Sequence, residues 1–318
     1  LIDKFLEDAI EIDVDALFDG TDLHMGGVME HIEEAGIHSG DSACTLPPVT
    51  LGPDVIDRVC AATRGIAEGV GVRGLINIQF AVASDILYVI EANPRASRTV
   101  PFVSKCIGES LAKVAARVMA GKSLAEVGFT REIIPTYFSV KEAVFPFAKF
   151  PGVDTILGPE MKSTGEVMGI DSDFAMAFAK SQLGAGVQLP MSGKVFISVK
   201  DSDKPFILEA ARGLETMGFE LVGTRGTAEW LKEHGGVTVS VINKVLEGQP
   251  HIVDAIVDGQ IALVFNTTEG VQSLKDSESI RMAAWSRKVP IFTTAAASDA
   301  SVKAIAALKA RPMEVRTL

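Results

Sequence analysis

The chain has 318 residues, of which 47% are hydrophobic and 22% are charged, and its formal net charge is −11. This acidic balance disfavours a broad nucleic-acid-binding face, which needs clustered Lys and Arg side chains. The apolar residues form short runs, which predicts no membrane span and no signal peptide. The three cysteines share no short spacing, which indicates free thiols in a reducing cytoplasm rather than disulfides or a zinc site.

The first half of the chain predicts strands joined by two helices. Residues 10–15 alternate between apolar and acidic side chains, which is typical of a half-buried strand. A helix is expected over 53–70, between Pro at its first turn and Gly at its end, and a second over 111–119. Two apolar runs within 75–92, separated by Ala-Ser-Asp, predict a hairpin. Residues 133–185 are mixed and rich in Gly and Pro, and we expect them to close the first domain.

From residue 194 onwards, predicted strands and helices alternate. The strands are expected at 195–199, 219–223, 237–242, 261–265 and 290–292. The helices are expected at 205–217, 227–234, 252–257, 280–287 and through 304–308. Repeated strand–helix units predict a mainly parallel sheet with helices on both faces. We therefore expect an α/β protein: an α+β domain with an antiparallel sheet over 1–190, then a doubly wound parallel α/β domain over 191–318.

Polar side chains gather on one face of the predicted hairpin. Gln79 on the first strand, and Glu91 and Asn93 on the second, follow the period of two that places alternate residues on one face. One carboxylate and two amide oxygens suit Mg²⁺, which completes its shell with phosphate and water. Arg95 and Arg98 follow at once and predict an anionic substrate. On the residues alone, the alternative is a simple turn after Asn93 with solvated charges.

Hydroxyl and amide side chains follow three predicted strands of the second domain, at 224–227, 266–268 and 293–294. The carboxyl ends of strands are where doubly wound folds bind ligands. Thr227 is expected at a helix N-terminus, where free N–H groups favour an anion, and Lys244 can add positive charge. Together these residues predict a phosphate pocket. The alternative is that the hydroxyl groups only cap helices.

Three longer blocks of sequence resemble those of carbamoyl phosphate synthetase large subunits. They are EANPRASRTVPFVSK at 91–105, EHIEEAGIHSGDS at 30–42, and DKFLEDA at 3–9 with Glu11. They stand in the family's order and spacing, and the likeness extends over the whole chain. It implies the C-terminal part of that subunit: the end of the second ATP-grasp half, then a methylglyoxal-synthase-like regulatory domain. The family's glycine-rich phosphate loop is not among these residues, so we expect a fragment with only part of the active site and no synthetase activity by itself.

The resemblance implies a glutamine-dependent synthetase that serves pyrimidine and arginine biosynthesis, in which this half phosphorylates carbamate with ATP and Mg²⁺ or Mn²⁺. It also implies a separate small glutaminase subunit and an oligomer of heterodimers. The implied nucleotide contacts are Lys4, Leu6, Glu11, Gly36, Ile37, His38, Ser39, Gln79 and Glu91. The implied metal ligands are Gln79, Glu91 and Asn93, and Arg95 and Arg98 would act on the phosphoryl group.

The resemblance also implies allosteric control by a nucleotide monophosphate such as UMP or IMP. The matching residues are Ser198, Lys204, Thr224, Thr227, Lys244, Asn266 and Thr268. Arg225 departs from the family pattern, in which His is familiar at that place. Glu33, Asp41 and Glu142 match family acids that bind ornithine, a cationic effector.

Two other interpretations stay open. The fragment could serve only to bind a nucleotide effector, because part of the catalytic half is absent. Alternatively, it could be a methylglyoxal synthase fused to a truncated ATP-grasp segment. Arg225 in place of the expected His disfavours this last interpretation, because that chemistry needs an acid–base pair in the pocket.

Overall fold

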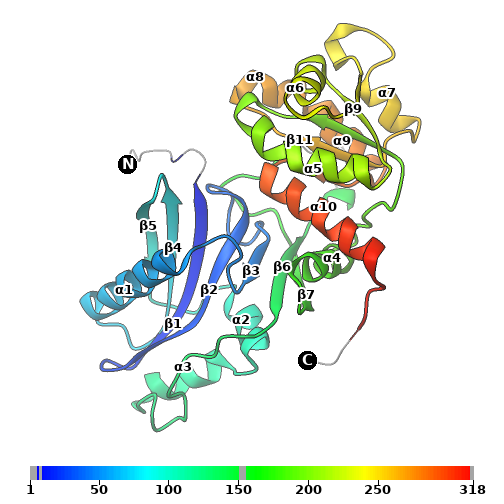
Figure 1. Ribbon diagram of the computed structural model, residues 1–318. Helices are drawn as coiled ribbons and strands as arrows, with labels where there is room; N and C mark the ends of the chain where they lie inside the picture. The colour runs from blue at the N-terminus through cyan, green and yellow to red at the C-terminus, as the bar shows by residue number, and fades with distance from the viewer. Residues whose placement is uncertain (1–5, 7–8, 150–154, 316–318) are drawn as a thin grey trace.

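The computed structural model describes residue 6 and residues 9–149 and 155–315, and the expected nucleotide contact Lys4 lies outside them. Within these residues the strands form two sheets, one of seven strands and one of five (Figure 1). In the described part of the chain, no helix is both long and apolar enough to span a membrane.

The first sheet is antiparallel throughout, with the order β5-β4-β1-β2-β3-β6-β7. Its strands are β1 (Ile10–Phe18), β2 (Leu23–Glu34), β3 (Cys44–Leu46), β4 (Gly74–Ala83), β5 (Ile86–Asn93), β6 (Phe138–Val144) and β7 (Gly165–Asp171). Helices α1 (Pro53–Val70), α2 (Val100–Ile107) and α3 (Leu111–Met119) pack on its strands β1, β2, β4 and β5. The expected hairpin and the helices at 53–70 and 111–119 are confirmed.

Strand β1 lies between β2 and β4 and is buried on both faces, so the prediction of a half-buried strand is wrong. One face packs on α1 through apolar side chains. On the other face, Glu11, Asp13 and Asp15 are only 4%, 1% and 0% exposed. The register sets Asp13 opposite Gln79 and Asp15 opposite Asn77 of β4. Strand β1 therefore brings a row of carboxylates to the face that carries the expected hairpin site.

The segment 133–185, which shows no clear period in the sequence, includes two strands and an α-helix in its described residues. These are β6, β7 and the helix α4 (Phe174–Gly184), which packs on both strands. Helix α4 also packs against α10 (Ala295–Ala310) of the second part of the chain. Met176 and Phe178 of α4 share one hydrophobic cluster with Phe292 and Ile305. A continuous apolar core thus joins the two sheets.

The second sheet is wholly parallel, as expected, with the order β10-β9-β8-β11-β12. Its strands are β8 (Lys194–Ser198), β9 (Glu220–Gly223), β10 (Val239–Val241), β11 (Leu263–Asn266) and β12 (Ile291–Phe292). The helices are α5 (Lys204–Thr216), α6 (Arg225–Gly235), α7 (Ile252–Val257), α8 (Gly270–Asp276), α9 (Glu278–Ser286) and α10. Two separate clusters, one with α5 and α10 and one with α7 and α9, cover opposite faces of the sheet. The doubly wound prediction is therefore confirmed.

Polar and aromatic contacts complete the junction between the two parts. Lys200 Nζ lies 3.6 Å from Glu34 Oε1 at the end of β2. The ring of Phe147 packs edge-on against Trp285 of α9, with the centroids 5.2 Å apart. Single-turn 3-10 helices stand near both contacts and in the second domain: η1 (Phe147–Lys149), η2 (Asp201–Asp203) and η3 (Val245–Glu247).

Candidate functional site

A cavity of about 460 Å³ opens on the polar face of β1, β4 and β5. Ten of the residues expected from the sequence line it: Glu11, Gly36, Ile37, His38, Ser39, Gln79, Glu91, Asn93, Arg95 and Arg98. Six lining residues were missed: Asp13, Asn77, Ile90, Ser97, Thr99 and Pro159. Leu6 is partly buried and is not among the lining residues. The structure thus brings together side chains from segments that lie far apart in the sequence.

The expected metal ligands meet on the β4–β5 hairpin. Gln79 stands directly opposite Glu91, and a shift in the pairing after it leaves Ile90 as an extra residue in β5. Asn93 Nδ2 donates a hydrogen bond of 2.7 Å to Glu91 Oε1. In the described residues, no group of three His, Cys, Asp or Glu side chains is arranged to hold a metal ion. The set on the hairpin, one carboxylate and two amides, consists of hard oxygen ligands of the kind that suit Mg²⁺, which completes its shell with phosphate and water.

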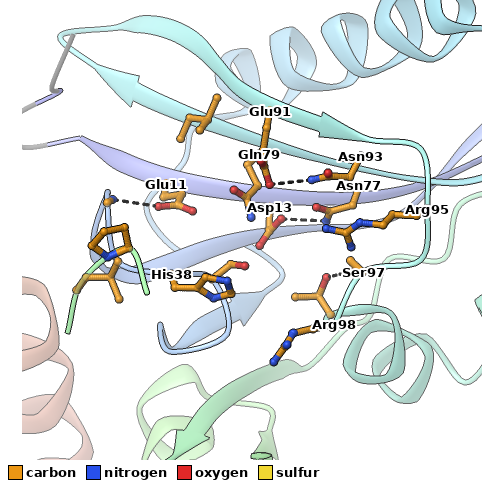
Figure 2. A pocket seen from close by; sticks show the side chains of 16 residues that line it. Glu11, Asp13, His38, Asn77, Gln79, Glu91, Asn93, Arg95, Ser97 and Arg98 are labelled. Atoms are coloured by element: carbon orange, nitrogen blue, oxygen red, sulfur yellow. Dashed lines mark hydrogen bonds between the residues drawn. The ribbon is translucent and has the colours of Figure 1, made fainter. Parts of the chain in front are cut away.

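The two ends of the cavity differ in charge. Figure 2 shows Glu11 and His38 toward one end and Arg95 toward the other, with Glu91 between them. Glu11 Oε2 accepts a hydrogen bond of 3.4 Å from the backbone N–H of Gly36, and burial raises the pKa of Glu11. The cavity can accordingly hold an elongated ligand with polar groups at one end and negative charge at the other.

His38 is held by backbone contacts on both sides. The backbone N–H of His38 donates to the carbonyl oxygen of Gly158 at 2.8 Å, and the ring nitrogen Nδ1 accepts from the backbone N–H of Gly40 at 3.0 Å. With Nδ1 used as an acceptor, the ring presents a fixed edge to the cavity.

A buried polar network lies under the cavity. Asn77 Nδ2 donates to Asp13 Oδ1 at 2.9 Å and to Asp15 Oδ1 at 3.0 Å. His31 Nε2 lies 3.3 Å from Asp13 Oδ2. Burial, the largest single influence, lowers the pKa of His31, but the hydrogen bond to Asp13 and the charges of Glu11 and Asp13 together outweigh it and raise that pKa above its ordinary value. The alternation of acids in β1 was the sequence signal for this network.

In the second domain, hydroxyl groups cluster at the carboxyl ends of β8 and β9. Thr224 Oγ1 lies 3.3 Å from Ser198 Oγ and donates to Thr227 Oγ1 at 3.3 Å. Thr224 is the N-cap residue of α6 by position, yet its side chain makes no capping bond. Thr294, by contrast, caps α10 by accepting from the N–H of Ala297. The helix-cap alternative therefore holds for Thr294 but not for Thr224.

The neighbouring strand end adds amide and hydroxyl groups. Asn266 Nδ2 donates to the Ser198 carbonyl oxygen at 3.3 Å, while its buried Oδ1 has no partner among the described residues. Thr267, which belongs to the expected pocket segment 266–268, accepts from the N–H of Lys200 at 3.0 Å. Thr268 is partly buried beside it. An unsatisfied buried oxygen favours a ligand that brings a hydrogen-bond donor.

The two expected lysines of this pocket differ in setting. Lys204 is largely buried at the start of α5, and its Nζ lies 2.6 Å from Asp201 Oδ1. The Lys204 ammonium group also lies near the N-terminus of α6, since a Cβ atom added to Gly226 there would be 3.8 Å from its Nζ. Lys244 is exposed just before η3. Lys204 therefore lies close to the hydroxyl cluster, and no described contact ties Lys244 to it.

Comparison with known proteins matches both parts of the chain. Residues 1–127 match the family model described as "Carbamoyl-phosphate synthase L chain, ATP binding domain", and residues 206–293 match the MGS-like domain. The carbamoyl phosphate synthase large chain of Pseudomonas putida is 59% identical over 305 residues, which are 96% of this chain and 28% of that protein. The large chain of Rhizobium meliloti is 55% identical over 323 residues, covering 100% of this chain and 28% of that protein.

The chain belongs to the carbamoyl phosphate synthase large-chain family.

This large-chain segment spans little more than a quarter of the curated relatives, 28% of the Pseudomonas putida protein. Its two parts are an ATP-grasp part and an MGS-like part, as expected. The boundary expected near residue 190 falls between the two matches and stays a prediction. Among solved structures, a biotin carboxylase domain of a single-chain bacterial carboxylase aligns with a TM-score of 0.44 and 22% identity, covering 54% of this chain and 45% of that one.

The acids expected to bind ornithine, Glu33, Asp41 and Glu142, are not among the residues that line the cavity. Burial, and then the nearby Glu33, raise the pKa of Glu142 to about 8. Glu33 Oε2 accepts from Ser42 Oγ at 2.8 Å and from the N–H of Ala43 at 2.6 Å. Asp41 instead accepts from two backbone N–H groups, at 162 and 163. Glu33 and Glu142 are thus electrostatic neighbours, whereas Asp41 serves a separate segment.

Proposed function

We propose that the cavity binds ATP with a divalent metal ion, Mg²⁺ or Mn²⁺, and that in the intact large chain it phosphorylates carbamate. The observation that carries this proposal is the order of groups along the cavity. Glu11 and the loop at 36–39 suit a ribose and base, the oxygen set at Gln79, Glu91 and Asn93 suits the metal, and the arginines suit phosphates. The match of this part to an ATP-binding domain supports the same assignment.

The reaction forms a bond between a carbamate oxygen and the γ-phosphorus and breaks the bond between that phosphorus and the bridging oxygen, so that ADP leaves. Such a transfer depends on alignment and charge neutralisation more than on acid–base groups. The metal ion supplies charge stabilisation at the transferred phosphoryl group when it is bound. In this chain Glu91, Gln79 and Asn93 would hold it, and Arg95 and Arg98 would orient the phosphoryl oxygens.

The wider activity is proposed on the strength of the relatives, because the chain spans only 28% of the Pseudomonas putida protein. We expect glutamine to supply ammonia through a small glutaminase subunit, within an oligomer of heterodimers, and the product to serve pyrimidine and arginine biosynthesis. The 318 residues alone should form no carbamoyl phosphate, because the family's glycine-rich phosphate loop is not among them.

The metal part of this proposal is tested by ADP binding to the intact large chain. In the parent protein, Mg²⁺ should strengthen the binding of ADP measured by calorimetry. Glu91→Gln should abolish that Mg²⁺ effect, because the amide removes the anionic ligand. The matched control is Glu109→Gln, at an exposed acid outside the cavity. Retention of the full Mg²⁺ effect in Glu91→Gln would exclude Glu91 as a ligand.

We also propose that the second domain binds a nucleotide monophosphate, such as UMP or IMP, and transmits that signal to the cavity. The hydroxyl cluster, the nearby Lys204 and the unpaired Asn266 oxygen support a phosphate and a donor group there. Lys200 supports the transmission. Its N–H binds Thr267 in the pocket, and its side chain reaches Glu34, two residues before the cavity residue Gly36. Coupling requires the effector to prefer one state of this contact, typically by about 1–3 kcal/mol.

Ornithine is the third ligand that we propose. Glu33 and Glu142 lie close enough to raise the pKa of Glu142, and a cation between them would relieve their repulsion. A calorimetric titration of the intact chain with ornithine should show binding that Glu142→Gln weakens. An unchanged affinity in that variant would place ornithine elsewhere.

A further inference from the structure

Asp15 is a buried carboxylate that does not line the cavity but lies directly behind it. Thr99 Oγ1 donates to its Oδ2 at 2.6 Å, and Ser97 Oγ donates to its Oδ1 at 2.7 Å. Asn77 Nδ2 donates to the same Oδ1 at 3.0 Å. Both hydroxyl donors come from residues 95–99, which we call the arginine segment because it carries Arg95 and Arg98.

Removing a carboxylate from water is costly unless hydrogen bonds replace the lost hydration. Here three donors offset that cost, although burial still raises the pKa of Asp15 to about 6. A buried charged cluster is often no more stabilising than a well-packed apolar cluster of the same volume, so core stability alone does not account for a carboxylate here. The donors of Asp15 instead tie the central strand to the arginine segment, 82 and 84 residues away in sequence.

The arginine segment has few other anchors for its cationic side chains. Within the part of the chain that the structure describes, Arg95 Nη1 donates only to the neighbouring carbonyl oxygen of Ala96, at 3.2 Å, and Arg98 Nη1 contacts Met161 Sδ. Ser97 Oγ also accepts from the N–H of Val100, the first residue of α2, at 3.2 Å. The direction of both guanidinium groups is therefore set mainly by the backbone between Asn93 and α2, and that backbone is held by the two hydroxyl groups.

We propose that Asp15 is a positioning residue that fixes the arginine segment and thereby aligns Arg98 with the transferred phosphoryl group. The inference rests on the proposed function of the cavity and adds to it a residue that no substrate atom touches. Catalytic groups must be held near the productive geometry, and a misplacement of about 1 Å costs about 100-fold in rate. The loss should appear in the chemical step, because the proposed ribose end of the cavity lies at Glu11, away from Arg95 of this segment (Figure 2).

The test uses Thr99, because its replacement by Val keeps the shape and removes only the hydroxyl group. In the intact large chain, the synthesis of ATP from ADP and carbamoyl phosphate is followed at saturating and limiting ADP. Thr99→Val should lower kcat about tenfold and change KM for ADP by less than about twofold. Thr99→Ser, which keeps the hydroxyl group, should restore kcat to within about twofold of the parent. A rise in KM with kcat unchanged would overturn the proposal.

A double-mutant cycle shows whether Thr99 acts through the arginine. In an Arg98→Ala background, Thr99→Val should cause less than about a twofold further loss of kcat, because the group that it positions is already gone. If the two substitutions lower kcat independently, so that their fold-losses multiply in the double variant, the proposal is overturned, because Thr99 then has a general structural role. Full activity of Arg98→Ala alone would instead overturn the proposed function of the arginine. If Thr99→Val fails to fold, Ser97→Ala completes the same cycle.

Discussion

The two polar regions of the molecule are built in opposite ways. Under the cavity of the antiparallel sheet, Asp13 and Asp15 are buried charges whose donors come from distant segments. At the strand ends of the parallel sheet, Ser198, Thr224 and Thr227 are neutral and bond chiefly to one another and to backbone. Buried charge fixes geometry at high cost, whereas a neutral cluster can rearrange around a charged ligand. The first suits phosphoryl transfer and the second suits sensing.

The largest expected effect concerns the stability of the buried acid network. His31→Leu leaves Asp13 without the imidazole 3.3 Å away, and losing one partner of a buried pair costs about 3–5 kcal/mol. The same substitution at His251, whose side chain caps α7 in the second region beside Asp254, should cost about 1 kcal/mol. Urea unfolding of both variants measures the difference. Equal losses would mean that the two regions do not differ in buried charge.

A smaller effect is expected at the neutral cluster. Thr227→Val removes the hydroxyl group that contacts Thr224 and accepts from the N–H of Val199 at 3.4 Å. A neutral hydrogen bond contributes about 1 kcal/mol, so the affinity for UMP or IMP should fall about fivefold. Calorimetry on the intact chain measures this change. Thr238→Val, outside the cluster on the loop before β10, is the control and should leave the affinity unaltered. An effect confined to Thr238→Val would move the phosphate away from the cluster.

The smallest effect is expected at the junction between the two regions. Lys200→Met removes the charge that lies 3.6 Å from Glu34 Oε1. Because ion pairs of this kind contribute about 0.2–1 kcal/mol, the effector should still bind while its influence on KM for ATP falls by about twofold or less. Glu34→Gln should show the same reduction, and the double variant no more than either alone. An undiminished effector response in all three would exclude this route.

The expected site could be predicted from the sequence where strand periodicity determines which side chains lie on the same face. Gln79, Glu91 and Asn93 share a face because alternate residues of paired strands do. The pairing shift that leaves Ile90 unpaired was not visible, because nothing in the local pattern marks it. Asp13 and Asp15 show the alternation of a strand, but their burial depends on Asn77 and the arginine segment, far away in sequence.

Small residues made other parts of the fold difficult to predict from the sequence. A Cβ at Gly169 would lie 2.0 Å from the carbonyl oxygen of Ala177, so β7 and α4 pack closely only because glycine stands there. In the sequence the same glycine favours a loop. The first half of α10 was missed because Ser298 and Ser301 are buried in it, and polar residues at core positions blur the helical period. Gly and Ser thus mark close packing here, a meaning that depends on residues distant in sequence.

The central claim is that Glu91 and its amide neighbours hold the metal ion for phosphoryl transfer. The most direct test is the rate of ATP synthesis from ADP and carbamoyl phosphate by the intact large chain carrying Glu91→Gln, with Glu109→Gln as the control. Loss of one preorganised charge at the reacting phosphoryl group costs about 100-fold or more in kcat. The account predicts a loss of that size for Glu91→Gln and none for Glu109→Gln. A rate for Glu91→Gln within about twofold of the parent would contradict it.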